Sequence, residues 1–589
     1  MNNPLRLEQI KNPFVRYVIR KISKIDVLEK LYDEWLNLNA GEHGDSEDFI
    51  EYIITKFDIR NDIINKEFID SIPRSGSVVI VANHPLGGLE GVLLSHILLK
   101  IRPDLKVLTN ELLRSFPEFQ NLFIGVDVLN ANKQHENAKG IRDVARHLSQ
   151  AGALLVFPAG TVSRINPFSM KITDAPWSLT ITRLARKYNA PIVPVFVSGR
   201  NSLGFYLSGL VHKRLRTILL PRAMIKKFGQ RVLFVFGMPI PAVDIQRLDD
   251  DEIATSYIRL CCKVLKNKAV NDLAEPEVSV SALKKDVDQD VVSNHVATLE
   301  EYILYAEDNF SLYCLPHDAL GPVAEQLAIE RERTFRLVDE GTGNELDCDY
   351  FDPHYQHLFL WDKKGEKIAG GYRIGITADI IKTEGLRGLY SHSLFDYNQK
   401  FIEGMGNTIE LGRSFVTENY QRQPKALDML WKGIGRFVAR HPTCHTLFGC
   451  VSISRQYSTI ATALLTDTFL YNYGVDHAVK RKVKARKPLN NVDMPWTEDQ
   501  IKNLSKIPIL NKLVGRIDEG KSIPVLIRHY LALNGQFVSF TVNEGFNRSL
   551  DGLIIVDLRN TKEKYLKRYM GKEGLEKFKT QWKGQADAA

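Results

Sequence analysis

The first half of the chain alternates short apolar runs with segments of helical spacing. Predicted strands lie at residues 78–82, 106–109, 153–157, 192–197 and 232–237. Short apolar runs bounded by turn residues are typical of parallel strands that are buried on both faces. Helical spacing at 139–150 and 179–187 separates these strands, and 244–268 has the pattern of a closing helix. The alternation predicts an α/β sheet domain over residues 76–268.

The second half of the chain contains another α/β block. Its predicted strands lie at 356–361, 369–374, 408–416, 447–452 and 553–556, with a helix at about 425–440. The two blocks are not copies of each other, so we expect two unrelated α/β domains. The remaining parts are a helical, membrane-associating segment at 1–75, a polar linker at 269–297, the second domain at 298–565 and a C-terminal helix or tail at 566–589.

Composition narrows the class of protein without naming its function. A chain of 589 residues is too long for one core and fits two or three domains. The six cysteines form no Cys-x-x-Cys pair, which indicates reduced thiols in a cytoplasmic setting. We expect neither a signal peptide nor a spanning helix, because no apolar run reaches the length that crosses a bilayer.

The basic residues are unevenly distributed along the chain. Residues 175–243 contain no Asp or Glu, and their many Lys and Arg alternate with apolar residues. Such patches bind nucleic acid, anionic lipid or an acidic protein partner. No nucleic-acid-binding motif accompanies them, which favours anionic lipid and no nucleic-acid partner. Residues 15–25 also have the pattern of a basic helix with an apolar face, either a membrane-surface helix or a helix packed on the domain.

A histidine at the end of the first strand is the first candidate for catalysis. His84 follows strand 78–82, Pro85 ends the strand, and a Gly-Gly pair turns the chain into a helical segment. The carboxyl ends of strands in open α/β sheets carry the chemistry. Histidine is the side chain best suited to move a proton near neutral pH, and Glu90 is close enough to hold one imidazole nitrogen. The alternative is a capped turn with an incidental histidine.

Three further segments accompany His84: Phe123-Ile-Gly-Val-Asp-Val, Phe157-Pro-Ala-Gly-Thr-Val-Ser-Arg and Ile192-Val-Pro-Val. In this order the set resembles the glycerolipid O-acyltransferases of the lysophosphatidic-acid type, over about residues 70–245. The resemblance implies that His84 is the general base that removes a proton from an acceptor hydroxyl, while Glu90 orients it. It also implies that Gly160 and Thr161 line the acceptor or oxyanion side.

The chain departs from that family at two places. The acid stands one residue later than usual, at Glu90, and the longer turn would have to bring it back to His84. Ala159 and Val162 replace a carboxylate and the arginine that would bind an acceptor phosphate. Loss of that guanidinium argues against a glycerophosphate acceptor, although Arg164 offers a substitute substrate-binding group.

The second candidate site lies on predicted strand 408–416. Glu410 and Arg413 are three residues apart and would face opposite ways on a regular strand. A bulge at Gly412 would place them on one side and splay the strand open, as in GNAT acyltransferases. With Arg373 upstream, this block resembles the GNAT-like ornithine N-acyltransferases, which are related to acyl-homoserine-lactone synthases. The resemblance implies that Glu410 binds or deprotonates the ammonium of an amino acid, while Arg373 and Arg413 support its carboxylate. A buried strand ion pair is the structural alternative.

The sequence around this strand also bears on the acyl donor and on bound cofactors. No glycine-rich pyrophosphate loop follows residue 416, which favours an acyl carrier protein over acyl-CoA as the donor. The basic run at 480–487 could dock such an acidic carrier or simply face solvent. We expect no bound cofactor and no metal, because His354 and His357 lack a third ligand.

The two blocks together resemble the bifunctional ornithine lipid synthases. The implied route is N-acylation of ornithine with a 3-hydroxyacyl chain, followed by O-acylation of the new hydroxyl, at the cytoplasmic side of the bacterial inner membrane. Alternatives are a glycine or serine lipid synthase, a phospholipid acyltransferase fused to an unrelated N-acyltransferase, and a membrane-active, hemolysin-like protein. The sequence does not name the amino acid or the oligomeric state.

Overall fold

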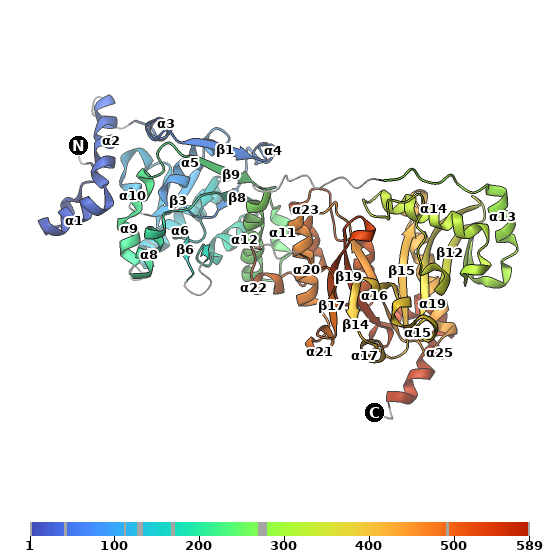
Figure 1. Ribbon diagram of the computed structural model, residues 1–589. Helices are drawn as coiled ribbons and strands as arrows, with labels where there is room; N and C mark the ends of the chain where they lie inside the picture. Colours follow the sequence, from blue (N-terminus) through green and yellow to red (C-terminus); the bar gives the residue numbers. More distant parts are fainter. Residues whose placement is uncertain are drawn as a thin grey trace. The chain divides into compact units, whose positions relative to one another are not determined.

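The computed structural model describes residues 3–39, 44–110, 113–126, 134–166, 171–211, 213–268, 280–489 and 494–586 (Figure 1). The chain divides into two compact units. The first unit comprises Met1–Asp272 and Pro495–Asn503, and the second comprises Leu273–Met494 and Leu504–Ala589. The point of division after Asp272 falls inside the range expected for the linker. Both units are α/β, as the sequence predicts.

A seven-stranded sheet forms the centre of the first unit, in the order β1-β9-β8-β2-β5-β3-β4. Neighbouring strands are parallel except β8 and β9. The bounds are β1 Arg60–Ile64, β2 Val78–Ala82, β3 Lys106–Asn110, β4 Phe123–Val126, β5 Ala153–Val156, β8 Ile192–Val197 and β9 Arg231–Phe236. The parallel arrangement brings the carboxyl ends of β2 and β5 to one edge of the sheet.

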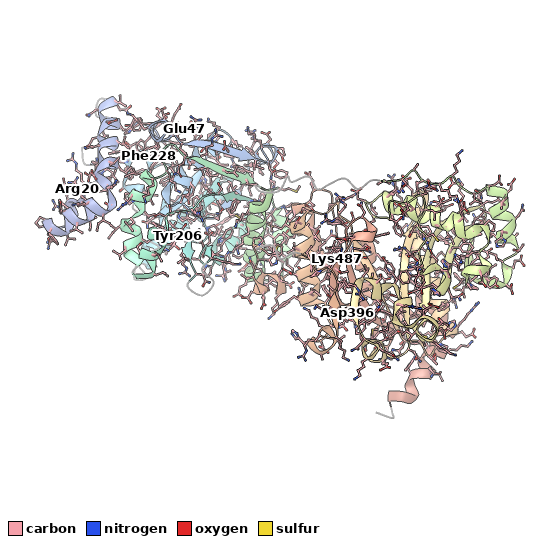
Figure 2. The ribbon with its side chains drawn as sticks, in the orientation of Figure 1. Arg20, Glu47, Tyr206, Phe228, Asp396 and Lys487 are labelled. Carbon is pink, nitrogen blue, oxygen red and sulfur yellow. The ribbon has the colours of Figure 1, made fainter. Side chains whose placement is uncertain are left out.

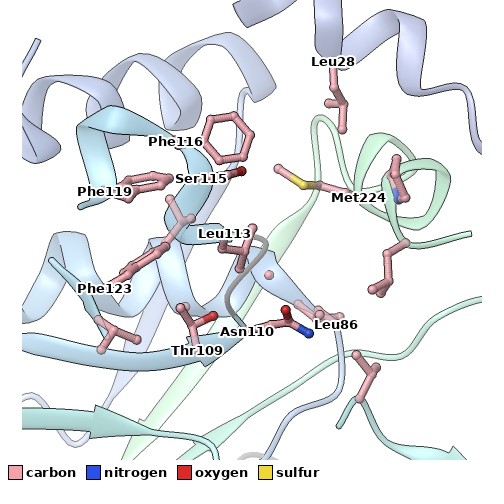
Figure 3. Close-up of a pocket in the computed structure, with 18 of the residues that line it drawn as sticks. Leu28, Leu86, Thr109, Asn110, Leu113, Ser115, Phe116, Phe119, Phe123 and Met224 are labelled. Atoms are coloured by element: carbon pink, nitrogen blue, oxygen red, sulfur yellow. The ribbon is translucent and has the colours of Figure 1, made fainter. Parts of the chain in front are cut away.

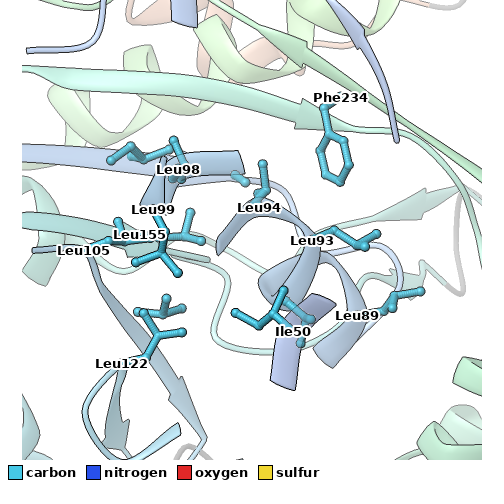
Figure 4. Packing of buried hydrophobic residues seen from close by; sticks show 14 of the residues in the cluster. Ile50, Leu89, Leu93, Leu94, Leu98, Leu99, Leu105, Leu122, Leu155 and Phe234 are labelled. Atoms are coloured by element: carbon cyan, nitrogen blue, oxygen red, sulfur yellow. The ribbon is translucent and has the colours of Figure 1, made fainter. Parts of the chain in front are cut away.

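Helices bury both faces of this sheet. Alternate residues of β2 point to opposite sides, and Val78, Ile80 and Ala82 belong to the same cluster as residues of α3 (Ser46–Phe57) and α5 (Gly88–Leu99). Figure 4 shows Leu93 and Leu94 of α5 packed in this cluster with Ile50 of α3. α7 (Leu179–Lys187) and α12 (Asp251–Lys268) pack together, and α12 contacts β8. The expected closing helix 244–268 is in fact two helices, with α11 at Ala242–Gln246 before α12.

The N-terminal region contains α1 (Pro13–Ser23), α2 (Ile25–Leu38) and α3, followed by β1. The prediction that residues 1–75 are helical is therefore wrong for 60–64, which pair in parallel with β9 at the sheet edge. The Arg-Asn-Asp start of β1 hides the strand pattern because edge strands tolerate polar residues. α2 is fixed by Tyr32 and Trp35, which both donate hydrogen bonds to the buried Glu118 carboxylate.

A short segment from late in the chain completes the first unit. Helix α22 (Glu498–Lys502) contacts α12, and both Gln500 and Ile501 are buried there. Lys263 of α12 donates a hydrogen bond to the side chain of Gln500 over 3.3 Å. Residues 495–503 therefore belong to the first unit, although in the sequence they lie between two segments of the second unit.

The second unit is built on an eight-stranded sheet in the order β10-β11-β12-β13-β15-β16-β19-β18. The bounds are β10 Ile303–Glu307, β11 Phe310–Pro316, β12 Gln356–Asp362, β13 Lys367–Ile376, β15 Thr408–Val416, β16 Thr446–Ile453, β18 Gln536–Asn543 and β19 Ser549–Asp557. Only β15 and β16 are parallel neighbours in this described sheet. They pair as far as Leu411 and Gly449 and then separate, which produces the expected splay. A side chain at Gly449 would come within 2.1 Å of the Leu411 carbonyl oxygen, so this approach requires glycine.

Helices cover both faces of the second sheet. α14 (Pro322–Arg336) packs in the cluster that contains Phe359 and Phe415, whereas α19 (Pro424–Arg440) packs against the other face and against α25 (Glu563–Ala586). The linker prediction is wrong for 289–297, because these residues form α13 (Gln289–Ala297) and bury Val292 and Val296 in the core. Residues 269–279, the start of the expected linker, lie outside the described residues.

Candidate functional sites

The first site is centred on His84, immediately after β2. The Asn83 side chain bonds to both the N–H and the carbonyl of Val197, so it ties this end of β2 to β8. Gly87 has φ +110°, a conformation that glycine adopts without strain, and α5 begins one residue later. This turn brings the buried Glu90 back to the histidine. His84 Nδ1 lies 2.9 Å from Glu90 Oε1, and that oxygen also accepts hydrogen bonds from the N–H groups of Leu86 and Gly87.

Two residues hold the backbone of His84. The N–H of Ser163 donates to the His84 carbonyl over 2.7 Å, and the Ser163 hydroxyl lies 2.5 Å from Asp174 Oδ1. The same Asp174 oxygen accepts a long hydrogen bond from the His84 N–H, at 3.4 Å. Ser163 follows the Phe-Pro-Ala-Gly-Thr motif and could have been found from it. Asp174 has no sequence signal, because it lies in a loop after the short strand β7 (Ile172–Thr173).

A deep apolar cavity of about 440 Å³ opens beside His84. Its volume lies in the range of small-molecule sites, ~300–1,000 Å³. Figure 3 shows Phe116, Phe119 and Phe123 gathered on one side of it. Leu28 of α2 and Met224 of α10 (Leu220–Ile225) also line the cavity. The cavity can therefore hold a long hydrocarbon chain with a reacting group at His84.

The other residues expected at this site are distributed unevenly. Gly160 and Thr161 line the cavity with His84, and Val162 lines it where the related enzymes have arginine. Arg164, the first residue of β6 (Arg164–Ile165), is exposed and is not among the lining residues. The sequence did not single out Arg216 of α9 (Lys213–Ile218), which does line the cavity.

The second site is built around Glu410 on β15. An extra residue between Gly412 and Phe415 makes a bulge opposite β13, and Arg413 has φ +48° there. Glu410 is buried and accepts hydrogen bonds from the Tyr355 hydroxyl and from the N–H groups of Tyr390 (3.1 Å) and Ser391 (2.7 Å). Burial raises the pKa of Glu410, which its hydrogen-bond donors partly offset. The bulge thus brings Glu410 and Arg413 to one site, joined by Tyr390, whose hydroxyl accepts a hydrogen bond from Arg413.

The arginines of this site are neutralised by aspartates that sequence reasoning missed. Arg413 Nε lies 2.9 Å from Asp347, and Arg413 Nη2 lies 3.0 Å from Asp349. Arg373 pairs with Asp349 at 2.5 Å and with Asp352 at 3.2 Å. These ion pairs hold the pKa of Asp349 below its usual value despite burial. No described ion pair joins Glu410 to either arginine, so Glu410 keeps its proton-accepting capacity without a fixed counter-cation.

Two further carboxyl groups near the splay lack a cationic partner among the described residues: Asp551, which accepts hydrogen bonds from Asn543 and Ser549, and Glu340. Burial raises the pKa of Asp551. Burial, followed by the charge of Asp551, raises the pKa of Glu340 to about 8.

Stability should therefore depend on the pH in a defined direction. Because the pKa of Glu340 is higher in the folded than in the unfolded chain, folded protein retains a proton that the unfolded chain has lost. Stability should fall as the pH rises from about 4.5 to 8. Glu340→Gln should reduce this slope and raise stability at pH 8. Urea unfolding of the wild type and the variant between pH 5 and 9 measures how the free energy of unfolding changes with pH. Equal changes in the two proteins would show that Glu340 is not the group responsible.

His357 and the basic run at 480–487 also stood out in the sequence, and each has its own surroundings in the structure. His357 is buried, its Nε2 lies 3.0 Å from the Asp352 carbonyl, and burial lowers its pKa to about 4. Within the described ranges, no cluster of three potential metal ligands occurs. In the same ranges, every helix is too short or too polar to span a bilayer. The run 480–487 crosses β17 (Val483–Ala485), and most of its basic side chains are exposed.

Comparison with protein families gives one match in each half of the chain. Residues 43–271 match a family described as acyltransferase, and residues 331–432 match a family described as acetyltransferase (GNAT) domain. The first match contains His84, Glu90 and most of the residues that line the cavity, and the second contains Glu410 and the ion-pair network. The chain therefore carries two acyltransferase domains.

Individual relatives carry related names. A "glycine N(alpha)-acyltransferase" of Bacteroides thetaiotaomicron is 27% identical over 39% of this chain and 71% of its own length. A "lyso-glycine lipid O-acyltransferase" of the same organism is 28% identical over 38% of this chain and 81% of its own length. An "L-ornithine N(alpha)-acyltransferase" of Agrobacterium fabrum is 25% identical over 51% of this chain and 95% of its own length. The protein is thus an enzyme of acyl transfer.

Proposed function

We propose that this two-domain acyltransferase makes an amino-acid lipid in two steps. The second unit transfers a 3-hydroxyacyl chain to the α-amine of ornithine, and the first unit esterifies the new hydroxyl with a second acyl chain. Both donors are acyl thioesters, with acyl carrier protein as the carrier. The observation that carries the proposal is the presence, in one chain, of a His84–Glu90 pair beside an apolar cavity and a buried Glu410 beside a splayed strand.

The geometry of the first unit fits O-acylation of a lipid. The His84 ring would accept the proton of the acceptor hydroxyl as its oxygen attacks the thioester carbonyl, and the buried Glu90 carboxylate would stabilise the resulting imidazolium. The apolar walls of the cavity suit an acyl chain. Ala159 and Val162 replace the carboxylate and the arginine that the resemblance would place at these two positions, which favours an acceptor other than glycerophosphate.

The geometry of the second unit fits N-acylation. The α-amine of an amino acid must lose a proton before it can attack a thioester. Glu410 has a raised pKa and forms no ion pair with a described cation, so it is suited to bind the ammonium and take that proton. The separation of β15 from β16 leaves unpaired backbone along which a pantetheine arm can bind. Relatives named for ornithine and for glycine support an amino-acid acceptor, and a glycine lipid is the second candidate.

Expression in a bacterium that lacks amino-acid lipids tests the proposal. Mass spectrometry of the extracted lipids should reveal a diacylated ornithine lipid that is absent from cells with the empty vector. A diacylated glycine lipid would show that glycine, the second candidate, is the acceptor in place of ornithine. New phosphatidic acid without any amino lipid would contradict the proposed function.

Membrane attachment is part of this proposal, because the intermediate is an amphiphile with one chain. α1 packs against α9 and α10, and α8 (Leu203–Val211) packs against α9. Figure 2 labels Arg20 on α1 and Tyr206 on α8. The apolar side chains that these helices leave exposed are Phe14, Val15, Tyr17, Ile22, Leu203, Leu207, Leu210 and Leu215. Exposed apolar residues among basic ones suit an anionic lipid surface.

Replacing Leu203 and Leu207 together by glutamine should weaken binding to vesicles that contain phosphatidylglycerol by at least about 10-fold, since each inserted leucine contributes roughly 1.5–3 kcal/mol. Cosedimentation with vesicles measures this. Val243→Gln is the matched control, because Val243 is an exposed apolar residue of α11, outside this set of helices. Equal binding by all three proteins would exclude these leucines from the membrane-binding surface.

A further inference from the structure

Two arginines near the His84 cavity lack an acidic partner among the residues that the structure describes. Arg216 of α9 is partly buried and lines the cavity together with His84 and Thr161. Arg164 lies at the start of β6, directly after the motif that contains Thr161. Neither guanidinium has a hydrogen-bond or ion-pair partner in the described part of the chain. By contrast, Arg183 and Arg186 of α7 both pair with Asp251.

The two arginines come from neighbouring elements: β6, which begins at Arg164, contacts α8, and α8 packs against α9, which carries Arg216. Burial lowers the pKa of Arg216, and the charge of Arg164 lowers it further. Holding like charges together at a partly desolvated place is unfavourable unless an anion binds between them. The stretch 175–243 contains no Asp or Glu, so the segment that carries α8, α9 and α10 supplies no such anion itself. A ligand would have to bring it.

The local packing keeps Arg216 at this place. Val162, Phe205 and Tyr206 form a small cluster that joins the motif loop to α8, and Leu219 and Leu220 pack against it. A side chain built at Gly209 would lie 3.3 Å from Arg216 Cδ, so the glycine in α8 leaves room for the arginine stem. The positive charge of Arg216 therefore lies at the wall of the cavity, beside Val162, where the resemblance would place an arginine.

We propose that Arg216, together with Arg164, binds the carboxylate of the acceptor's amino-acid headgroup during O-acylation. The inference rests on the proposed function, because an N-acylated amino acid keeps a free carboxylate but no longer has a charged α-amine. A guanidinium presents two parallel N–H groups that match the two oxygens of a carboxylate. Binding the headgroup there would leave the acyl chain for the apolar cavity and the 3-hydroxyl for His84.

The test uses two synthetic acceptors with the full-length protein and one acyl thioester donor: N-(3-hydroxyacyl)ornithine and the same compound with its carboxylate converted to the carboxamide. The readout is the ratio of kcat/KM for the two acceptors. The wild type should favour the carboxylate by about 10- to 100-fold, the range for hydrogen bonds between charged groups. Arg216→Gln should bring the ratio close to one, and Arg216→Lys, which keeps the charge but loses the fork, should give an intermediate ratio.

Arg222→Gln is the matched control, because Arg222 is an exposed arginine of α10 and its loss changes the net charge equally. It should keep the wild-type ratio. An unchanged ratio in Arg216→Gln would overturn the assignment. A raised KM for the thioester donor, with both acceptors affected equally, would also overturn it, because the bound anion would then be the phosphate of the donor. A wild type that acylates neither acceptor would instead contradict the proposed function itself.

Discussion

Glutamine in place of Glu410 is expected to slow N-acylation by about 10²–10⁴-fold, the usual contribution of a positioned base. Both the monoacylated and the diacylated lipid should then disappear, because the first step supplies the second. Glutamine fills the same space but cannot take a proton from the α-ammonium. Its amide N–H₂ would also face the N–H groups of Tyr390 and Ser391, which now donate to the carboxylate.

The same group determines the pH dependence of this step. Because burial raises the pKa of Glu410, the rate should fall with decreasing pH at values above the ordinary range for glutamate. Glu418→Gln is the control: Glu418 is exposed and lies two residues after the end of β15. Rates of acyl transfer to ornithine, measured by mass spectrometry between pH 5 and 9, test both statements. A Glu410→Gln protein with a tenth or more of the wild-type rate would remove Glu410 from the role of base.

Alanine in place of His84 is expected to stop the pathway after its first step. The O-acylation rate should fall by about 10²–10⁴-fold, because the acceptor hydroxyl would lose the base that we propose for it. The proposed N-acylation site lies in the other unit and should stay active, so the monoacylated lipid should accumulate. Glu90→Gln should have a smaller effect in the same direction. The amide oxygen of glutamine can still accept hydrogen bonds from the N–H groups of Leu86 and Gly87, but it carries no negative charge to stabilise the imidazolium.

Lipid extracts analysed by mass spectrometry measure the ratio of monoacylated to diacylated product. His96→Ala is the control, since His96 lies on the same helix and contacts only Lys100 among its described side-chain partners. It should leave the ratio unchanged. Continued formation of the diacylated lipid by the His84→Ala protein would place the base elsewhere.

The apolar strands were predictable because burial on both faces leaves little room for polar residues. Residues 78–82, 179–187 and 408–416 are the elements β2, α7 and β15 with the same bounds. β1 and β10 were not predicted, because they lie at sheet edges where one side faces solvent and polar residues are tolerated. The helix at 289–297 was hidden by its polar residues, and its contacts with α14 place two of its three valines, Val292 and Val296, in a core.

The candidate sites were predictable only where chemistry and motif coincide along the chain. His84, Glu90 and Glu410 stand in recognisable segments: His84 and Glu90 lie together after β2, and Glu410 lies beside the bulge of β15, while their catalytic roles stay predictions. The aspartates that pair with Arg373 and Arg413 lie in the loop between α14 and β12, and no local pattern marks them. Asp174 likewise reaches His84 only through folding. Charge neutralisation inside a core is a property of tertiary contacts, which spacing in the sequence does not encode.

Because residues 495–503 belong to the first unit, the gene cannot be divided into two intact domains by a single cut. The chain passes between the units after residues 272, 494 and 503, so each unit is built from two separate segments of the chain. A gene truncated after residue 272 would encode a first acyltransferase domain that lacks α22, so part of α12 would be uncovered. The remaining gene would encode the GNAT-type domain with a short insertion that has no place in its own core. Fission of this enzyme would therefore require compensating changes on both sides of the cut.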